Sequence, residues 1–125
     1  MTGLAWLTFL FAAAIGAPAR YVVDRFVQDR TESLFPRGTW VVNVSGCFVL
    51  GVITGLGLYH GLDGTTRTVI GTGGMGAYTT FSTFSFETVR VAEQGAIDVA
   101  VKNVVASFVA GLAAAAAGLG LAAVL

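Results

Sequence analysis

The residues best suited to chemistry lie together in one run, from Gly71 to Glu87, with the sequence GTGGMGAYTTFSTFSFE. The run combines glycines, hydroxyls and aromatic rings with a carboxylate, yet it lies where hydropathy predicts a membrane span. Lipid offers no hydrogen bonds, so an unpaired polar group there is strongly unfavourable. A helix neighbour, water or a solute must therefore meet these groups, and the run is the first candidate for a functional site.

The first half of this run predicts a broken helix. Four glycines lie within six residues, and glycine is a poor helix former, so we expect a break near Gly76. Broken membrane helices leave free carbonyls and amide ends inside the protein, where ions bind. The glycines therefore point to an ion site at the break.

The second half predicts a polar stripe beside two rings. Helical spacing places Thr80, Thr83 and Glu87 on one stripe, and Phe81 and Phe84 on its neighbour. A structural helix could use the same residues for aromatic packing and for hydroxyls bonded to its own backbone. A polar ladder beside stacked rings is unusual for that purpose, and it favours a path for a solute.

Other polar residues also fall within apolar stretches. Asn43 either bridges helices or lines a polar path, and Arg20 either reaches the membrane interface or acts near an aqueous vestibule. Glu87 is an acid at membrane depth, where it could handle protons, bind cations or cap its helix at the water boundary. Asn103 and Ser107 are four residues apart and share a helix face. Each of these alternatives stays open from sequence alone.

Composition sets the class of protein. Only 11% of the 125 residues are charged and 55% are apolar, whereas soluble domains carry about 25% charged residues. The zero net charge argues against a nucleic-acid partner. The single cysteine, Cys47, has no partner and is expected to be a small packing residue. His60 is expected at the membrane interface.

Four apolar stretches reach the length of a membrane crossing, at about residues 4–23, 38–60, 68–91 and 103–125. We predict an all-α membrane protein, a single domain (1–125) of four transmembrane helices with the third broken near its middle. The first stretch lacks a basic start and is expected to be a retained span rather than a signal peptide. A bundle this small has little interior, so oligomerisation is expected.

Small residues four apart predict close helix contacts, because helices associate in lipid through tight backbone packing. There are three such pairs: Gly51 and Gly55, Gly57 and Gly61, and Ser107 and Gly111.

Arginine and lysine predict the orientation of the spans, because short loops rich in them stay in the cytoplasm. The opposite side carries Arg67 alone. The two connections expected inside carry the rest: Arg20 at the edge, Arg25, Arg30, Arg37, Arg90 and Lys102. Both termini are therefore expected outside.

With these motifs in place, the chain resembles the Fluc (CrcB) family of fluoride ion channels. The resemblance rests on GAPAR at 16–20, on the stretch 38–46 that contains Asn43, and on the run from Gly73 through TTFSTFS to Glu87. It covers essentially the whole chain, although the fourth span matches weakly, and many relatives have tyrosine where Asn103 stands. It implies a fluoride-selective channel for passive export, a multi-pass protein of the prokaryotic plasma membrane.

The resemblance also implies an assembly and a set of site residues. Members form antiparallel dimers with two pores and a structural sodium ion (Na+) at the centre. By motif position, the pore path would be formed by Phe81, Phe84, Asn43, Ser82, Thr83 and Ser107. The backbone carbonyls of Gly76 and Thr79 would hold the sodium, and Arg20 and Glu87 would lie at the vestibules.

These residue types suit fluoride, which is small and strongly hydrated. Hydroxyl and amide groups can donate the hydrogen bonds that replace its water. The positive rim of a phenyl ring can face an anion. Conduction requires several modest sites, and a central cation lowers the cost of nearby anions.

Three other functions compete with this one. The main rival is a small four-span proton-coupled transporter that uses Glu87 as its exchanging carboxylate; a purely structural or assembly role is the second. An enzyme is disfavoured, because no nucleophile, base and acid occur together and His60 has no metal-ligand company.

The dimer poses its own alternative. An antiparallel homodimer requires each copy to insert either way up, which favours equal arginine and lysine counts on the two sides. The count here is six to one, or five to one if Arg20 is counted as within the membrane. The expected partner is a second copy, and a close paralogue of opposite orientation is the alternative.

Overall fold

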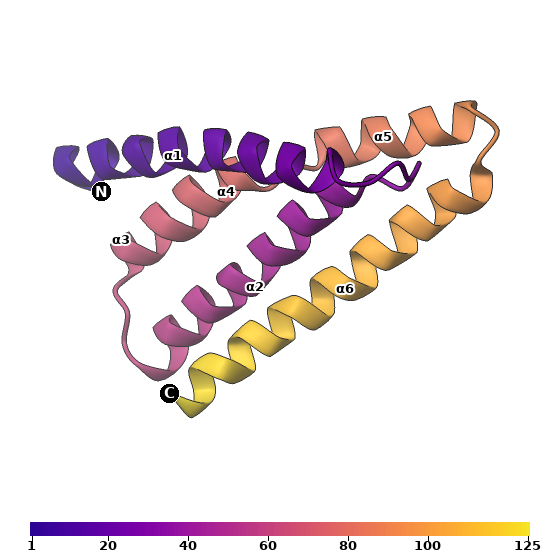
Figure 1. Ribbon diagram of the computed structural model, residues 1–125. Helices are drawn as coiled ribbons and strands as arrows, with labels where there is room; N and C mark the ends of the chain where they lie inside the picture. Colours follow the sequence, from indigo (N-terminus) through magenta and orange to yellow (C-terminus); the bar gives the residue numbers. More distant parts are fainter.

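The computed structural model describes residues 1–125, and all its regular elements are helices (Figure 1). Three helices are long and apolar enough to cross a membrane: α1 (Gly3–Gln28), α2 (Arg37–Tyr59) and α6 (Ile97–Val124). The remaining crossing is built from pieces: α3 (Gly64–Arg67), η1 (Thr68–Met75), α4 (Gly76–Tyr78) and, after a break, α5 (Ser82–Glu93). The all-helical prediction with a broken third segment is confirmed.

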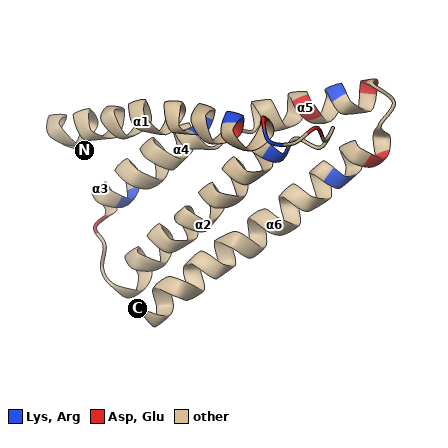
Figure 2. Cartoon of the chain, in the orientation of Figure 1, with Lys and Arg blue, Asp and Glu red and all other residues tan.

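The elements form two groups that meet at one end of the molecule. In Figure 1, α2 and α6 run side by side in the same direction, while α1 lies across η1 and α4. The N-terminus, the connection 60–63 and the C-terminus lie at one end, and the connections 29–36 and 94–96 lie at the other. Figure 2 shows nearly all charged residues at that second end, leaving Asp63 and Arg67 at the first. The fold therefore sorts the charges as the sequence predicts.

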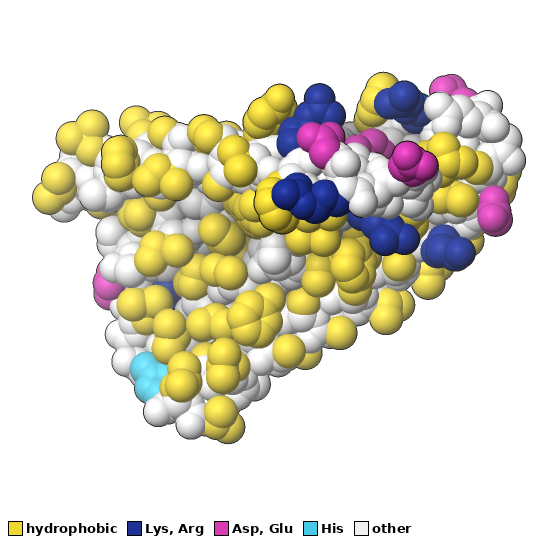
Figure 3. Space-filling model, viewed as in Figure 1, with side chains coloured by type: hydrophobic (Ala, Val, Ile, Leu, Met, Phe, Trp, Pro, Cys, Tyr) yellow, Lys and Arg dark blue, Asp and Glu magenta, His cyan; other side chains and the backbone are white.

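The surface is that of a membrane protein. Only 20 of the 125 residues are buried, and large apolar side chains on α1 and α6, such as Phe11 and Phe108, are 69% exposed. Figure 3 shows apolar side chains spread across the visible face, with most of the charged ones gathered at one end. Water would disfavour such a surface and lipid favours it.

Helices α2 and α6 touch through their backbones. A Cβ on Gly51 would overlap the Ala115 carbonyl, and one on Gly118 would overlap the Phe48 carbonyl. A Cβ on Gly55 would meet the methyl group of Ala122. The predicted contact through the Gly51 and Gly55 pair is confirmed.

The Gly57 and Gly61 pair is a wrong prediction. Gly57 lies against the Arg67 side chain, and Gly61 lies beyond the end of α2 with φ +70°. This left-handed conformation favours glycine, so Gly61 serves the turn rather than a helix contact. His60 lies just before Gly61 and joins the end of α2 to the end of α6, because its Nε2 is 2.7 Å from the Ala122 carbonyl oxygen.

The broken crossing differs from a regular helix in two places. Residues 68–75 form a π-helix, a wide turn that is rare and often found at functional sites. Its Gly74 lies against α1, where a Cβ on Gly16 would overlap the Gly74 carbonyl. The break itself lies at Thr79–Phe81, a few residues beyond the predicted Gly76, which instead begins α4. The glycines allow close approach to α1 and the wide turn, while the residues after them form the break.

The helices also extend beyond the apolar stretches. The last connection is only 94–96, so residues 97–102, predicted as loop, belong to α6. The third crossing begins at Gly64 rather than at residue 68. A hydropathy window detects the part of a helix that lies in lipid, and a helix continues into the polar boundary as long as its own hydrogen bonds allow.

Two glycines on α6 offer a matched test of the close α2–α6 contact. Gly118→Ala should lower the free energy of unfolding by about 1–3 kcal/mol, because the added methyl group meets the Phe48 carbonyl. Gly120→Ala should leave it unchanged or slightly raised, since a Cβ there meets nothing within 4 Å and alanine is the better helix former. Thermal unfolding in detergent measures both; equal melting temperatures would contradict the contact.

Candidate functional site at the helix break

An asparagine of α2 forms hydrogen bonds with the peptide groups that the break leaves without helical partners. Thr79 is extended (φ −79°, ψ 163°), so the helical hydrogen bonds stop there. The Asn43 side chain donates from Nδ2 to the Thr80 carbonyl at 2.8 Å and accepts from the Thr80 N–H at 2.8 Å. Asn43 therefore replaces both hydrogen bonds that an unbroken helix would give this residue. Of its two predicted roles, bridging helices is the one seen in these contacts.

The Thr80 side chain starts the next helix. Its buried hydroxyl accepts from the Thr83 N–H at 3.1 Å, which is the bond of a helix N-cap. The same hydroxyl donates to Thr83 Oγ1 at 3.1 Å and lies 3.3 Å from Ser82 Oγ. Three hydroxyls therefore gather at the break, among them the predicted Ser82 and Thr83.

Because the Thr80 and Thr83 N–H groups have other acceptors, two backbone carbonyls lack the donors that a regular helix would give them. In an unbroken α-helix, the Gly76 carbonyl accepts from the Thr80 N–H and the Thr79 carbonyl from the Thr83 N–H. Here the Thr80 N–H donates to Asn43 and the Thr83 N–H donates to the Thr80 hydroxyl. Both carbonyl oxygens keep lone pairs for another partner, and a Cβ on Gly76 would meet nothing within 4 Å.

An open groove of about 420 Å³ lies beside the break, between α2, α5 and α6. It brings together four predicted path residues from separate elements: Asn43, Phe81, Phe84 and Ser107. The two rings lie 5.9 Å apart at 42°, and Phe81 is 79% exposed. The groove is therefore largely apolar with a few polar groups at its wall.

The other face of the break carries a different cavity. About 190 Å³ is lined by Arg20 of α1, Thr39 of α2 and Thr83 of α5, among others. The Thr39 hydroxyl is buried there without a hydrogen-bond partner. Thr80 lines both this cavity and the groove. Thr83 and Arg20 therefore lie on the opposite side of the break from the two rings.

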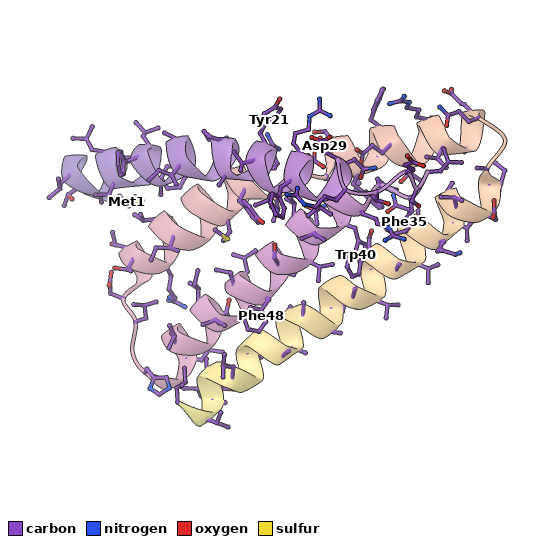
Figure 4. The ribbon with its side chains drawn as sticks, viewed as in Figure 1. Met1, Tyr21, Asp29, Phe35, Trp40 and Phe48 are labelled. Atoms are coloured by element: carbon purple, nitrogen blue, oxygen red, sulfur yellow. The ribbon has the colours of Figure 1, made fainter.

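Glu87 lies farther along α5, at the charged end. It lines a polar cavity of about 310 Å³ with Asp24, Gln28 and Arg90, and its Oε2 is buried without a partner. In Figure 4 the labelled Asp29 lies in this same region, near the end of α1. The structure does not bring Glu87 to the groove.

A buried asparagine is the residue that sequence reasoning left outside the site. Asn103 is only 2% exposed; its Nδ2 donates to Thr88 Oγ1 at 2.8 Å, and its Oδ1 accepts from Ser107 at 3.3 Å. The spacing of Asn103 and Ser107 signalled a shared face. No sequence signal identified Thr88, because the partner lies on another helix.

These features define a class, a multi-pass α-helical protein of the cell membrane with a polar break in one crossing. Residues 7–119 match the family described as CrcB-like protein, Camphor Resistance (CrcB), and the chain belongs to this family.

Several curated relatives cover nearly the whole chain. One from Streptomyces avermitilis, "Fluoride-specific ion channel FluC 1", is 49% identical over 90% of this chain and 91% of its own length. One of the same name from Leifsonia xyli subsp. xyli is 46% identical over 97% and 87%. "Fluoride-specific ion channel FluC 2" from Mycobacterium bovis is 41% identical over 94% and 90%. All three names describe channels rather than enzymes.

The pairing of Asn43 with Thr80 predicts a large effect of removing the amide. Asn43→Leu leaves the Thr80 N–H and carbonyl unpaired, at about 1–3 kcal/mol each, so the melting temperature should fall and the Thr80 amide should exchange faster with deuterium. Thr54→Val serves as the control, because this exposed α2 residue makes no side-chain hydrogen bond. An unchanged Thr80 exchange rate in Asn43→Leu would contradict the pairing.

Proposed function

We propose that this chain forms a fluoride-selective channel that lets fluoride leave the cell passively. The observation that carries the proposal is the groove, where two phenylalanine rings meet an asparagine and a serine at a broken helix. Relatives that are 41–49% identical over most of this chain are named fluoride-specific ion channels, which supports the same ion here.

The groove residues can replace the water that fluoride must shed. Phe81 and Phe84 are tilted by 42°, so ring rims rather than one flat face are available along the groove. A ring rim is positive and attracts an anion weakly. The Asn43 amide has a second proton beyond the one it donates to Thr80, and the Ser107 hydroxyl can donate when it leaves its present acceptor. Several modest contacts in series allow an ion to enter and to leave, which conduction requires.

The groove is open on one side, which supports a dimer. Its wall is open and Phe81 is 79% exposed. A second subunit over this face would exclude lipid from the polar groups. The proposed arrangement is antiparallel, and the partner is a second copy or a close paralogue. The six-to-one charge distribution across the two ends is the reason to keep the paralogue in view.

A structural sodium ion is proposed at the break. The carbonyl oxygens of Gly76 and Thr79 fit it, because both have lost their helical donors and alkali cations prefer oxygen ligands. Gly76 has open space around it, where a partner's carbonyls could approach. When bound, the ion would supply positive charge that stabilises the carbonyls and an anion nearby. The break itself is held by Asn43 and Thr80.

The position of Glu87 favours a channel over a proton-coupled transporter. A coupled carrier needs its exchanging acid where the substrate binds. Glu87 lies instead at the charged end, beside Asp24 and Arg90, while the groove contains no acid. Dependence of flux on a proton gradient would reverse this preference.

Fluoride flux is the direct test. Liposomes that contain the purified protein should release fluoride rapidly and chloride negligibly, as a fluoride-selective channel requires. Phe81→Ile or Phe84→Ile should slow fluoride release at least tenfold (about 1.4 kcal/mol in the barrier), since each removes a ring from the groove.

Phe11→Ile is the matched control for these variants. Phe11 is 69% exposed on α1, away from the groove, so its loss should leave the flux unchanged. Well-folded protein without fluoride flux would refute the channel, and normal flux in both ring variants would refute the path.

The sodium site predicts a cation-specific stability. Replacing sodium by potassium or by a large organic cation should lower the melting temperature and the dimer fraction in detergent, because two carbonyls lose their partner. Light scattering and thermal unfolding report both without any flux measurement. Equal values in sodium and potassium would exclude a sodium-specific site.

A further inference from the structure

A chain of hydrogen bonds runs from the groove into the contact between α5 and α6. Ser107, at the groove wall, donates from Oγ to Asn103 Oδ1 at 3.3 Å. Asn103 donates from Nδ2 to Thr88 Oγ1 at 2.8 Å, and Thr88 donates to the Phe84 carbonyl at 2.7 Å. Asn103, in the middle, is 2% exposed, so water does not compete for its bonds.

Counting protons fixes the direction of this chain. The Thr88 hydroxyl has one proton, and the Phe84 carbonyl, which can only accept, takes it. Thr88 Oγ1 can therefore only accept from Asn103, which requires the amide NH₂ to face Thr88. The amide oxygen must then face Ser107, and Ser107 must donate to it. The polarity of the whole chain therefore follows from the carbonyl at its end.

This polarity leaves Ser107 unsuited to an anion in its resting state. Its only proton points into the helix contact, and its lone pairs remain for the groove. An anion needs a donor, so Ser107 can bind one only after it gives up the bond to Asn103. That bond is the longest of the three, and breaking it leaves a buried amide oxygen unpaired.

We propose that Asn103, held by Thr88, is a positioning residue that competes with the passing anion for the Ser107 proton and so weakens anion binding at the groove wall. The inference rests on the proposed fluoride channel. A site weakened in this way releases its ion more readily, as conduction requires.

A pair of substitutions at Thr88, which does not line the groove, separates polarity from packing. Thr88→Val keeps the shape of the side chain but removes the hydroxyl that fixes the orientation of the Asn103 amide. The amide can then turn its NH₂ toward Ser107, which makes one hydrogen bond as before but leaves the Ser107 proton free for the groove. The half-saturating fluoride concentration for flux should fall about fivefold, the equivalent of one hydrogen bond of about 1 kcal/mol. Thr88→Ser keeps the hydroxyl and should behave as the unmodified protein.

The concentration dependence of initial fluoride flux from liposomes gives both parameters. A merely structural defect would lower the maximum rate and leave the half-saturating concentration unchanged. Asn103→Leu provides a second route, because it removes the competing oxygen and should also lower that concentration. In a Ser107→Ala background, Asn103→Leu should no longer change the half-saturating fluoride concentration.

Each outcome decides between the proposals. If the unmodified protein conducts no fluoride, the proposed function fails and this inference fails with it. If it conducts, and both Thr88→Val and Asn103→Leu keep the unmodified half-saturating concentration, only the inference fails. Persistence of the Asn103→Leu effect in the Ser107→Ala background would also overturn it, since Asn103 would then act through another group.

Discussion

The paired hydrogen bonds between Asn43 and the Thr80 peptide are the interaction on which the site depends. A helix broken at membrane depth exposes N–H and carbonyl groups that lipid cannot satisfy. One amide side chain supplies a donor and an acceptor to the same residue, each at 2.8 Å. With the break stabilised in this way, α5 can start on a cap from the Thr80 hydroxyl. The direction of α5, and with it the position of Phe84, follows from these few bonds.

The break also divides the polar residues between two faces. Thr80 lines the groove on one side and the cavity of Arg20 and Thr39 on the other. Phe81 faces the first, and Thr83 faces the second. A further cavity, between α2 and α6, is lined by Trp40. Figure 4 shows the Trp40 side chain on α2, as it does that of Phe48. Phe81 and Thr83 are thus close in sequence but lie on separate surfaces in space.

The glycines and the polar partners show best what the sequence could predict and what it could not. Composition correctly predicted a broken third crossing, because glycines and hydroxyls are costly in a lipid-facing helix. It misplaced the break at Gly76, because glycine also permits the wide turn and the close contact of Gly74 with Gly16. Asn43 was recognised as out of place in lipid, yet its partner was not, since Thr80 is 37 residues away.

Sequence by itself determined the membrane class, the charge distribution, the family and most of the residues near the break. These depend on local composition and motif spacing, which the chain carries without folding. Tertiary structure alone decided which polar groups meet: Asn43 with Thr80, Asn103 with Thr88, and Ser107 with its proton turned inward. Hydrogen bonds between helices depend on the rotation and depth of each helix, and packing between α1, α2, α5 and α6 sets both.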